Sequence, residues 1–400
     1  MGIKPALLMG LGAGLAVMAW WLWPAQAAQP GMQDPMAILQ AAPPAVGGPS
    51  ASAARSLETM PQGGPLSPAG LFMREQQIEA SKLRLAQAEQ ALRAYEQHAR
   101  YPHGSRPAKE HPDQLRPFDP VVEEHPLRTP GGTAMQGVKL VTSQERIFLS
   151  GPETSRVSVR LQDAEGNPLP LRMTRSVFKE VTEPGRTAQT PERQVTLSDD
   201  GQGGLTTVLA PSLQGFGNFA GRLRLELWMQ YGGQPGFTYF DLIYNPGEAA
   251  RWLPGVAESV TDGSLQLALR AEVLRPGRYV VSARVDDAKG EPVAVLLFNE
   301  ELGAGPQQIP LQVHGRLMHD LQPAMPLRLR DVEAFLLIPD TFPDRIMLPR
   351  LAGVQHRTQS YALDRFTQRE WQSGERERYM AELGKDVEGA RADLKRLGGP

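Results

Sequence analysis

The feature that most constrains this chain is a twelve-residue pattern that occurs twice. Residues 157–168 (VSVRLQDAEGNP) and 281–292 (VSARVDDAKGEP) match at a constant offset of 124 residues. In each copy, apolar and polar residues alternate before Asp-Ala-x-Gly-x-Pro, which predicts a half-buried strand followed by a tight turn. In such a turn the Asp carboxylate binds the local backbone, Gly supplies a positive φ, and Pro begins the next segment. A repeat this long has the period of a domain, so it predicts two related β domains.

Further strand patterns surround both copies of the repeat. Many strands without interleaved helices, in a chain with 40 Gly and 36 Pro, predict a mostly β fold. We expect two immunoglobulin-like β-sandwich domains in tandem, over 137–250 and 255–360. The predicted strands are 137–149, 156–162, 193–197, 205–209, 222–230 and 237–244 in the first domain, and 265–273, 278–286, 293–299, 307–313, 327–330 and 332–338 in the second.

Several turn motifs give the chain a resemblance to a known class of proteins. These motifs are the two repeated turns, Ser198-Asp-Asp-Gly-Gln-Gly-Gly204, Pro276-Gly-Arg-Tyr279, Gly315-Arg-Leu317 and Leu329-Arg-Asp-Val332. Over about 137–360 the chain resembles bacterial exported proteins with tandem immunoglobulin-like modules, and its second domain is similar to choice-of-anchor X regions. The resemblance implies the sandwich fold and an exported protein, and it carries no defined catalytic activity. Gly204 stands where such relatives often have a further Asp.

The N-terminal residues 1–27 predict export. Residues 6–23 contain no charged side chain, and this uncharged stretch is nearly long enough to span a bilayer. The cluster of Trp20, Trp21 and Trp23 is typical of an interfacial belt on an uncleaved signal anchor. The triplet Ala25-Gln-Ala27 suits signal-peptide cleavage before Ala28 instead. We therefore expect inner-membrane anchoring toward the periplasm, or a periplasmic protein if cleavage occurs.

The region between the apolar segment and the first domain has three expected parts. Residues 28–66 are rich in Ala, Pro, Gly and Ser, and we expect a disordered linker. Residues 67–100 predict a helix with a thin apolar stripe that starts at Ser67-Pro68. Seven prolines lie between 101 and 130, so we expect an extended strap over 101–136 rather than a helix or central strand.

The C-terminal residues 364–398 predict a second helix, with a capping box at Thr367–Glu370. Its apolar residues follow a 3-4 spacing that forms one interaction seam, Met380, Leu383, Val387, Ala390, Leu394 and Leu397. The seam is expected to pair with the 67–100 helix or with a second subunit, because so short a helix is marginal alone.

Candidate binding residues gather between 216 and 240. Trp228, Tyr231, Phe237 and Tyr239 form either a binding platform for sugar rings or a partner, or part of the sandwich core. Asp199 and Asp200, with Asp241, are weak candidates for calcium, because the alternating ligand pattern of a calcium loop is missing. His103, His111 and His125 in the strap, and His314 with His319 and Asp320, are spaced poorly for a metal site.

Composition excludes several functions. The chain has no Cys, which removes disulfides, thiolate catalysis and iron–sulfur clusters. A net charge of −2 gives no field for nucleic acid. No nucleophile elbow, phosphate loop or zinc-protease motif is present, so no catalytic residue or cofactor is expected. The sequence favours a non-enzymatic binding or scaffolding protein of the bacterial envelope, whose partner is an envelope protein or glycan. The alternative is an envelope-polymer hydrolase or carbohydrate-binding accessory protein.

Overall fold

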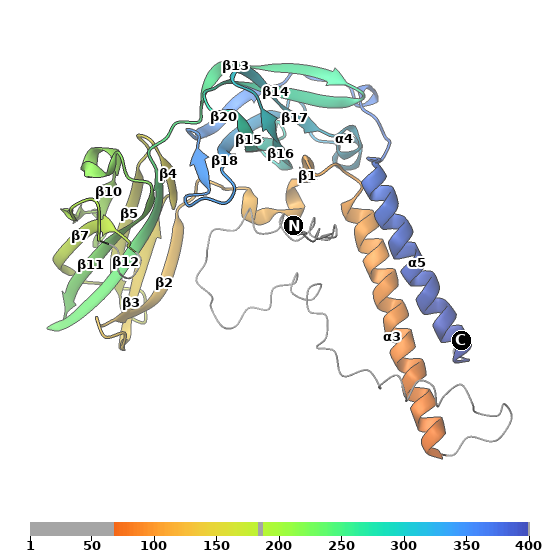
Figure 1. The fold of residues 1–400 in the computed structure, drawn as a ribbon, viewed down its shortest axis with the longest axis horizontal. Coiled ribbons are helices and arrows are strands. Elements are labelled where there is room, and N and C mark those ends of the chain that lie inside the picture. The colour runs from red at the N-terminus through yellow and green to blue at the C-terminus, as the bar shows by residue number, and fades with distance from the viewer. Residues whose placement is uncertain (1–67, 183–186, 399–400) are drawn as a thin grey trace, which may run out of the picture. The chain divides into compact units, whose positions relative to one another are not determined.

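The computed structural model describes residues 68–182 and 187–398. The expected signal segment and linker lie outside the described residues. No helix within the described ranges is both long and apolar enough to cross a membrane. The described residues from Ala80 onward belong to one compact unit, which holds two β modules and most of helix α3 (Pro68–His98). The prediction of a mostly β fold built from antiparallel sheets is confirmed (Figure 1).

The first β module covers 121–245 and consists of two strand layers. One layer has the order β8-β7-β11-β12, with β4 beside β12, and the other has the order β2-β3-β5-β10-β9, with β6 beside β5. Among the strand pairs of the described residues, only Phe237–Arg128 joins the two layers. Its strands are β2 (Val121–Arg128), β3 (Ala134–Gln144), β4 (Phe148–Ser150), β5 (Ser155–Gln162), β6 (Pro168–Leu169), β7 (Arg172–Glu180), β8 (Arg193–Gln194), β9 (Ser198–Asp199), β10 (Gly204–Leu209), β11 (Gly221–Tyr231) and β12 (Gln234–Asn245).

Alternating residues of both layers form the core of this module. Leu223, Leu225 and Leu227 of β11 are fully buried and share one cluster with Val157 and Val159 of β5. The residues between them point to the opposite face of each sheet, because the side-chain period of a strand is two. The same alternation therefore determines which residues of β11 and β12 point away from the core.

The second β module covers 250–357 and also contains β1 (Ser105–Pro107). Its larger sheet has the order β1-β16-β15-β18-β19, with β20 also beside β18, and its smaller sheet has the order β13-β14-β17. One buried cluster holds residues of both sheets, from Ala249 to Phe366. Its other strands are β13 (Ala250–Thr261), β14 (Ser264–Val273), β15 (Gly277–Asp286), β16 (Pro292–Leu302), β17 (Gly305–Val313), β18 (Arg328–Leu337), β19 (Arg345–Met347) and β20 (Leu351–Arg357).

The repeated turn has the predicted structure in both modules. Asp163 accepts hydrogen bonds from the amides of Glu165 (3.0 Å) and Asn167 (2.7 Å), and Gly166 has a φ of 91°. Asp287 accepts from the amides of Lys289 (2.8 Å) and Glu291 (2.9 Å), and Gly290 has a φ of 92°. The turn interpretation of these two carboxylates is thus confirmed.

The expected strap over 101–136 is wrong in two respects. Residues 121–128 form β2, which pairs with β3 along its length and with β12 at one residue only. Pro126 is tolerated because β2 lacks a full partner on its second side. The first module therefore begins near 121 rather than 137. Val121 and Val122, at the start of β2, are exposed.

The remaining part of the strap belongs to the second module. β1 pairs with residues 294–296 of β16 and lies beside it although it precedes the whole first module in sequence (Figure 1). Ser105 and Ala108 are fully buried, and the Ser105 hydroxyl accepts a hydrogen bond from the His314 amide (2.9 Å). The first module is therefore inserted into the sequence of the second, which differs from the simple tandem expected.

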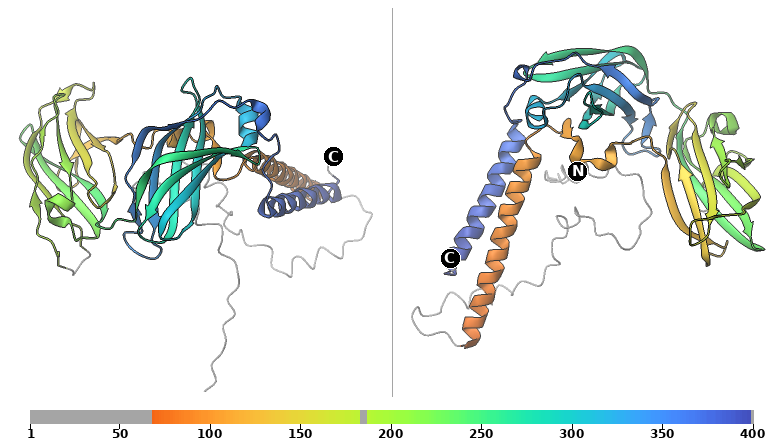
Figure 2. Two further views of the ribbon diagram at one scale, coloured as in Figure 1. Left: turned by 90° about the horizontal axis from the view of Figure 1, so that it is seen from above. Right: turned by 180° about the vertical axis from the view of Figure 1, so that it is seen from behind.

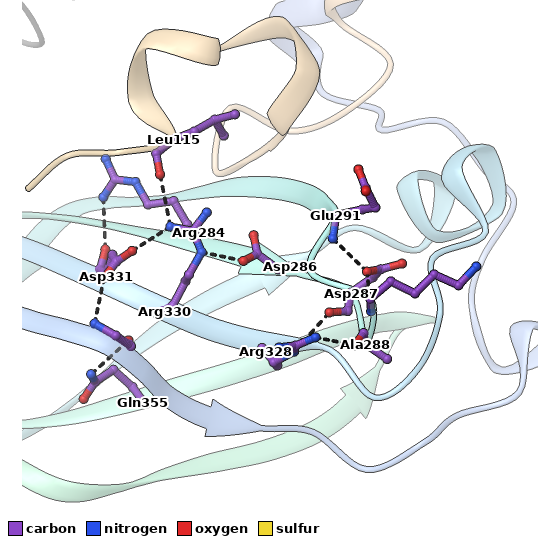
Figure 3. A network of polar contacts seen from close by, with 12 residues as sticks. Leu115, Arg284, Asp286, Asp287, Ala288, Glu291, Arg328, Arg330, Asp331 and Gln355 are labelled. Carbon is purple, nitrogen blue, oxygen red and sulfur yellow. Dashed lines mark hydrogen bonds and ion pairs between the residues drawn. The ribbon is translucent and has the colours of Figure 1, made fainter. Parts of the chain in front are cut away.

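An arginine network attaches the 3-10 turn η2 (Pro112–Gln114) to the sheet (Figure 3). Arg284, only 4% exposed, donates to the Gln114 carbonyl (2.6 Å) and the Asp331 carbonyl (3.1 Å). Arg330 donates to the Leu115 carbonyl (3.0 Å) and pairs with Asp286 and Asp331. Burial lowers the pKa of Arg284 to about 10. The strap thus covers charged side chains on the face of β15 opposite the core.

Helix α5 (Gly374–Arg396) starts later than predicted. Ser373 is its N-cap and accepts a hydrogen bond from the Arg376 amide (3.0 Å). Thr367 does not cap a helix, because its amide donates to the Gly263 carbonyl (2.8 Å) and its hydroxyl accepts from the Arg369 amide. The segment from 367 to 373 is therefore held against the second module in a non-helical conformation.

The apolar seam of α5 faces α3. Val387, Ala390 and Leu394 are buried, whereas Met380, Leu383 and Leu397 are half-buried. From Ala80 onward, α3 lies alongside α5 in both views of Figure 2. Three contacts with antiparallel spacing join the helices: Arg84–Asp393 (3.4 Å), Glu89–Arg391 (2.9 Å) and the rings of Tyr95 and Tyr379, whose centroids are 5.7 Å apart.

Candidate binding face

The outer face of β7, β11 and β12 carries the aromatic residues singled out from the sequence. Trp228 of β11 pairs in register with Phe237 of β12 and with Arg175 of β7. Tyr239 follows two residues after Phe237 on the same face and is 48% exposed. The three aromatic rings are consecutive, with centroids 5.3 Å apart for Trp228–Phe237 and 6.2 Å apart for Phe237–Tyr239. We call Arg175, Trp228, Phe237, Tyr239 and Arg224 the aromatic face.

Two arginines complete the aromatic face. The guanidinium carbon of Arg175 lies 4.6 Å from the ring centroid of Trp228, and that of Arg224 lies 3.9 Å from the centroid of Tyr239. Such contacts between a guanidinium and a ring are favourable by about 0.5–1 kcal/mol at exposed sites. The row therefore stabilises its own sheet, and it also presents a partly exposed aromatic surface on which the two guanidinium groups lie over the rings of Trp228 and Tyr239.

The structure separates the two interpretations of these aromatics. Phe240 points into the core, and Trp228, Phe237 and Tyr239 point away from it. The core interpretation is thus wrong for these three, because Leu227, Met229 and Phe240 already occupy the inward positions. Tyr231 is not part of the face, because it is partly buried and packs against the core cluster.

Sequence reasoning missed Arg175 and Arg224. Arg175 lies on β7, which pairs with β11 across more than forty residues of chain. Residues 172–180 do not alternate regularly and are not among the predicted strands, and only the register of β7 places Arg175 beside Trp228. Arg224 lies four residues before Trp228 on the same strand face, so the two-residue period was the available signal.

Ion pairs neutralise the charged side chains on and beside the aromatic face. Arg224 donates twice to the Asp241 carboxylate, at 2.7 and 2.8 Å. Lys179 pairs with Glu226 at 2.9 Å. Hydrogen bonding to Asp241, opposed by burial, raises the pKa of Arg224. Asp241 therefore holds the guanidinium against Tyr239 and is not free to bind a cation with Asp199 and Asp200.

A polar hollow adjoins the aromatic face. Its volume is about 380 Å³, and Arg224 belongs to both features. The hollow is lined by Lys179, Glu180, Val181, Thr182, Ala188, Thr190, Glu192, Arg224 and Glu226. Glu180 is 6% exposed; its Oε2 accepts from the Gln189 amide (2.8 Å), and its Oε1 has no hydrogen-bond partner among the described residues.

The calcium candidates form a turn. Asp199 accepts from the Gly201 amide (2.7 Å), and Asp200 accepts from the amides of Gln202 (2.7 Å) and Gly204 (2.8 Å). Asp200 also pairs with Arg160 at 3.2 Å. Burial opposes a lower pKa of Asp200, but these amide and arginine bonds still lower it. Both carboxylates are thus turn formers, and residues 68–182 and 187–398 contain no cluster of metal-ligating side chains.

His314, His319 and Asp320 lie in or next to one short helix. Residues 315–321 form helix α4, and His314 is its N-cap residue. His319 contacts the Phe366 carbonyl (3.0 Å), and Asp320 accepts from Tyr101 (2.7 Å) and pairs with Arg100 (3.1 Å). These contacts connect α4 to both chain segments that lead into the helices.

Comparisons with known proteins give distant structural neighbours. No family model matches the chain, and no curated protein matches it. A crystal structure of a DUF4785 family protein from Legionella pneumophila is similar at 11% identity and a TM-score of 0.38, over 55% of this chain and 57% of that one. The adhesin InvE of Yersinia pseudotuberculosis is similar at 13% identity and a TM-score of 0.18, over 52% of this chain and 58% of that one. These likenesses do not extend to function.

Proposed function

We propose that this chain is a non-enzymatic binding protein of the bacterial cell envelope, built from two immunoglobulin-like sandwiches. The uncharged segment 6–23 supports export and tethering through an N-terminal anchor, and the turn motifs support the resemblance to choice-of-anchor X proteins. The observation that carries the binding role is the aromatic face. Trp228, Phe237 and Tyr239 lie outside the core in one row, and Tyr239 is 48% exposed, so packing of the core does not account for them.

Co-sedimentation with an insoluble envelope fraction tests this proposal. The full chain in detergent solution is mixed with cell envelopes that have been stripped of membrane, and the bound fraction is measured. Trp228→Ala combined with Tyr239→Ala removes two rings, and we expect about tenfold weaker binding. Leu213→Ser is the matched control, because Leu213 is an 87% exposed apolar residue of the same module outside the face. Equal binding by the double variant and the control would contradict the proposal.

A further inference from the structure

We propose that the aromatic face and the adjoining polar hollow form one binding site for a neutral glycan chain. This inference rests on the proposed binding function and adds the ligand class. Arg224 makes the two features continuous, because it stacks on Tyr239 and also lines the hollow. A sugar ring offers an apolar C–H surface that packs on an aromatic ring, and hydroxyl groups that a polar hollow can bind.

The size and lining of the hollow suit a carbohydrate unit. Small-ligand sites are typically about 300–1,000 Å³, and this hollow has about 380 Å³. Thr182 and Thr190 offer hydroxyl groups, which both donate and accept. Glu180 offers a carboxylate that the Gln189 amide orients through one oxygen. A buried carboxylate oxygen without a partner is unfavourable, so a ligand hydroxyl that donates to Glu180 would be stabilising.

The charges of the site favour a neutral ligand. Both cations that line the hollow already have carboxylate partners, Lys179 with Glu226 and Arg224 with Asp241. A phosphate or a polyanionic glycan would have to compete with these pairs. A cationic ligand would likewise have to compete with existing pairs, because Glu226 pairs with Lys179 (2.9 Å) and Glu192 pairs with Arg175 (3.5 Å). A hydroxyl-rich, uncharged polymer can bind without breaking any of these ion pairs.

Affinity electrophoresis of the full chain in detergent tests the inference. Each gel carries one neutral polysaccharide (dextran, laminarin, galactomannan or hydroxyethylcellulose) or the polyanion alginate. We expect retardation by at least one neutral polymer and not by alginate. Trp228→Ala with Tyr239→Ala should weaken the apparent affinity about tenfold or more. Thr190→Val, which removes only a hydroxyl, should weaken it about fivefold.

Controls separate this inference from the proposed function. Leu213→Ser and Thr133→Val change exposed residues outside the site and should bind like the parent chain. The unfolding temperature of each variant shows whether a loss of binding reflects unfolding. Retardation by alginate alone, or neutral binding that both site variants retain, would overturn the inference. If no polysaccharide retards the chain while the envelopes still bind it through the aromatic face, the glycan class is wrong and the proposed function stands. If the envelopes do not bind it either, both fail.

Discussion

A single carboxylate organises each copy of the repeated turn, but the two copies differ in their surroundings. Asp163 serves its own turn and is half-buried. Asp287 is 5% exposed and also accepts from the Ala324 amide (3.2 Å), so it connects the turn to the segment before β18. The same six-residue motif is thus a local turn in one module and a tertiary contact in the other.

Asp287→Ala should therefore destabilise the second module strongly. Three backbone amides lose their acceptor, and we expect a loss of about 2–3 kcal/mol in the free energy of unfolding. The matched change Asp163→Ala should cause a clearly smaller loss, because water can reach that turn. Urea unfolding followed by tryptophan fluorescence measures both. Equal losses would show that the Ala324 contact adds nothing.

The contribution of Asp287 should also depend on pH. Burial opposes a lower pKa, but the amides of Glu291, Ala324 and Lys289 lower it below that of the unfolded chain. A carboxyl with a lowered pKa stabilises the fold above its unfolded pKa of about 3.9, and this stability is lost as the pH falls through the folded pKa. The stability difference between parent and Asp287→Ala should be constant from pH 7 to 5 and should shrink toward pH 3.

We predict opposite changes in stability when alanine replaces Gly315 and when it replaces Gly384. A Cβ on Gly315 would lie 2.0 Å from the Gly263 carbonyl oxygen and 2.6 Å from the Thr367 amide. Gly315→Ala should therefore destabilise by about 1–3 kcal/mol or more, through overpacking. Gly384 lies within α5 with nothing near its added Cβ, and Gly384→Ala should stabilise the helix by about 0.5–1 kcal/mol. Thermal unfolding compares the two, and a shift of the same sign in both would contradict this packing argument.

At the scale of elements, the sequence predicts the strands in which apolar and polar residues alternate. It misses strands whose burial depends on which other strands they pair with. A strand such as β11, which buries every second residue, can be predicted from its own sequence. β13 was missed because Pro254 and Gly255 lie in its bulge, and only one of its twelve residues is buried. The aromatic residues were found by composition. Neither arginine partner was predicted: Arg175 requires the pairing of β7 with β11, whereas Arg224 requires only the two-residue period of β11.

The pairing of α5 with α3 gives a prediction at the same scale. Leu394 is 6% exposed, and burial of one aliphatic side chain is worth about 1.5–3 kcal/mol. Leu394→Asp should release α5 from α3 and lower helicity. Ala392→Asp adds the same charge at an exposed position of the same helix turn and should change little. Tryptic cleavage within α5 and far-UV circular dichroism measure the release. Cleavage that is equally slow in both variants would show that the seam does not hold the helix.

At the scale of the whole molecule, the insertion changes what can fold alone. The first module, 121–245, contains its own core and all strands of its two layers. The second module contains its core but depends on the distant segment 99–117 for β1, for burial of Val295 and for acceptors of Arg284 and Arg330. The two modules are therefore unequal as folding units, although the repeat suggests two equivalent ones.

Fragments of the chain test this dependence. Residues 119–246 should unfold cooperatively as an isolated β protein. Residues 249–371 alone should be unstable or aggregate, because β16 loses β1 on one side and the 4%-exposed Arg284 loses the Gln114 carbonyl, one of its two carbonyl acceptors. Joining 99–118 to 249–371 through a flexible Gly-Ser linker should restore cooperative unfolding, since the strap then returns to its sheet. Circular dichroism melts and size-exclusion chromatography of the three fragments measure this. If the fragment without the strap melts at the same temperature as the linked one, the strap is an accessory and the second module is complete within 249–371.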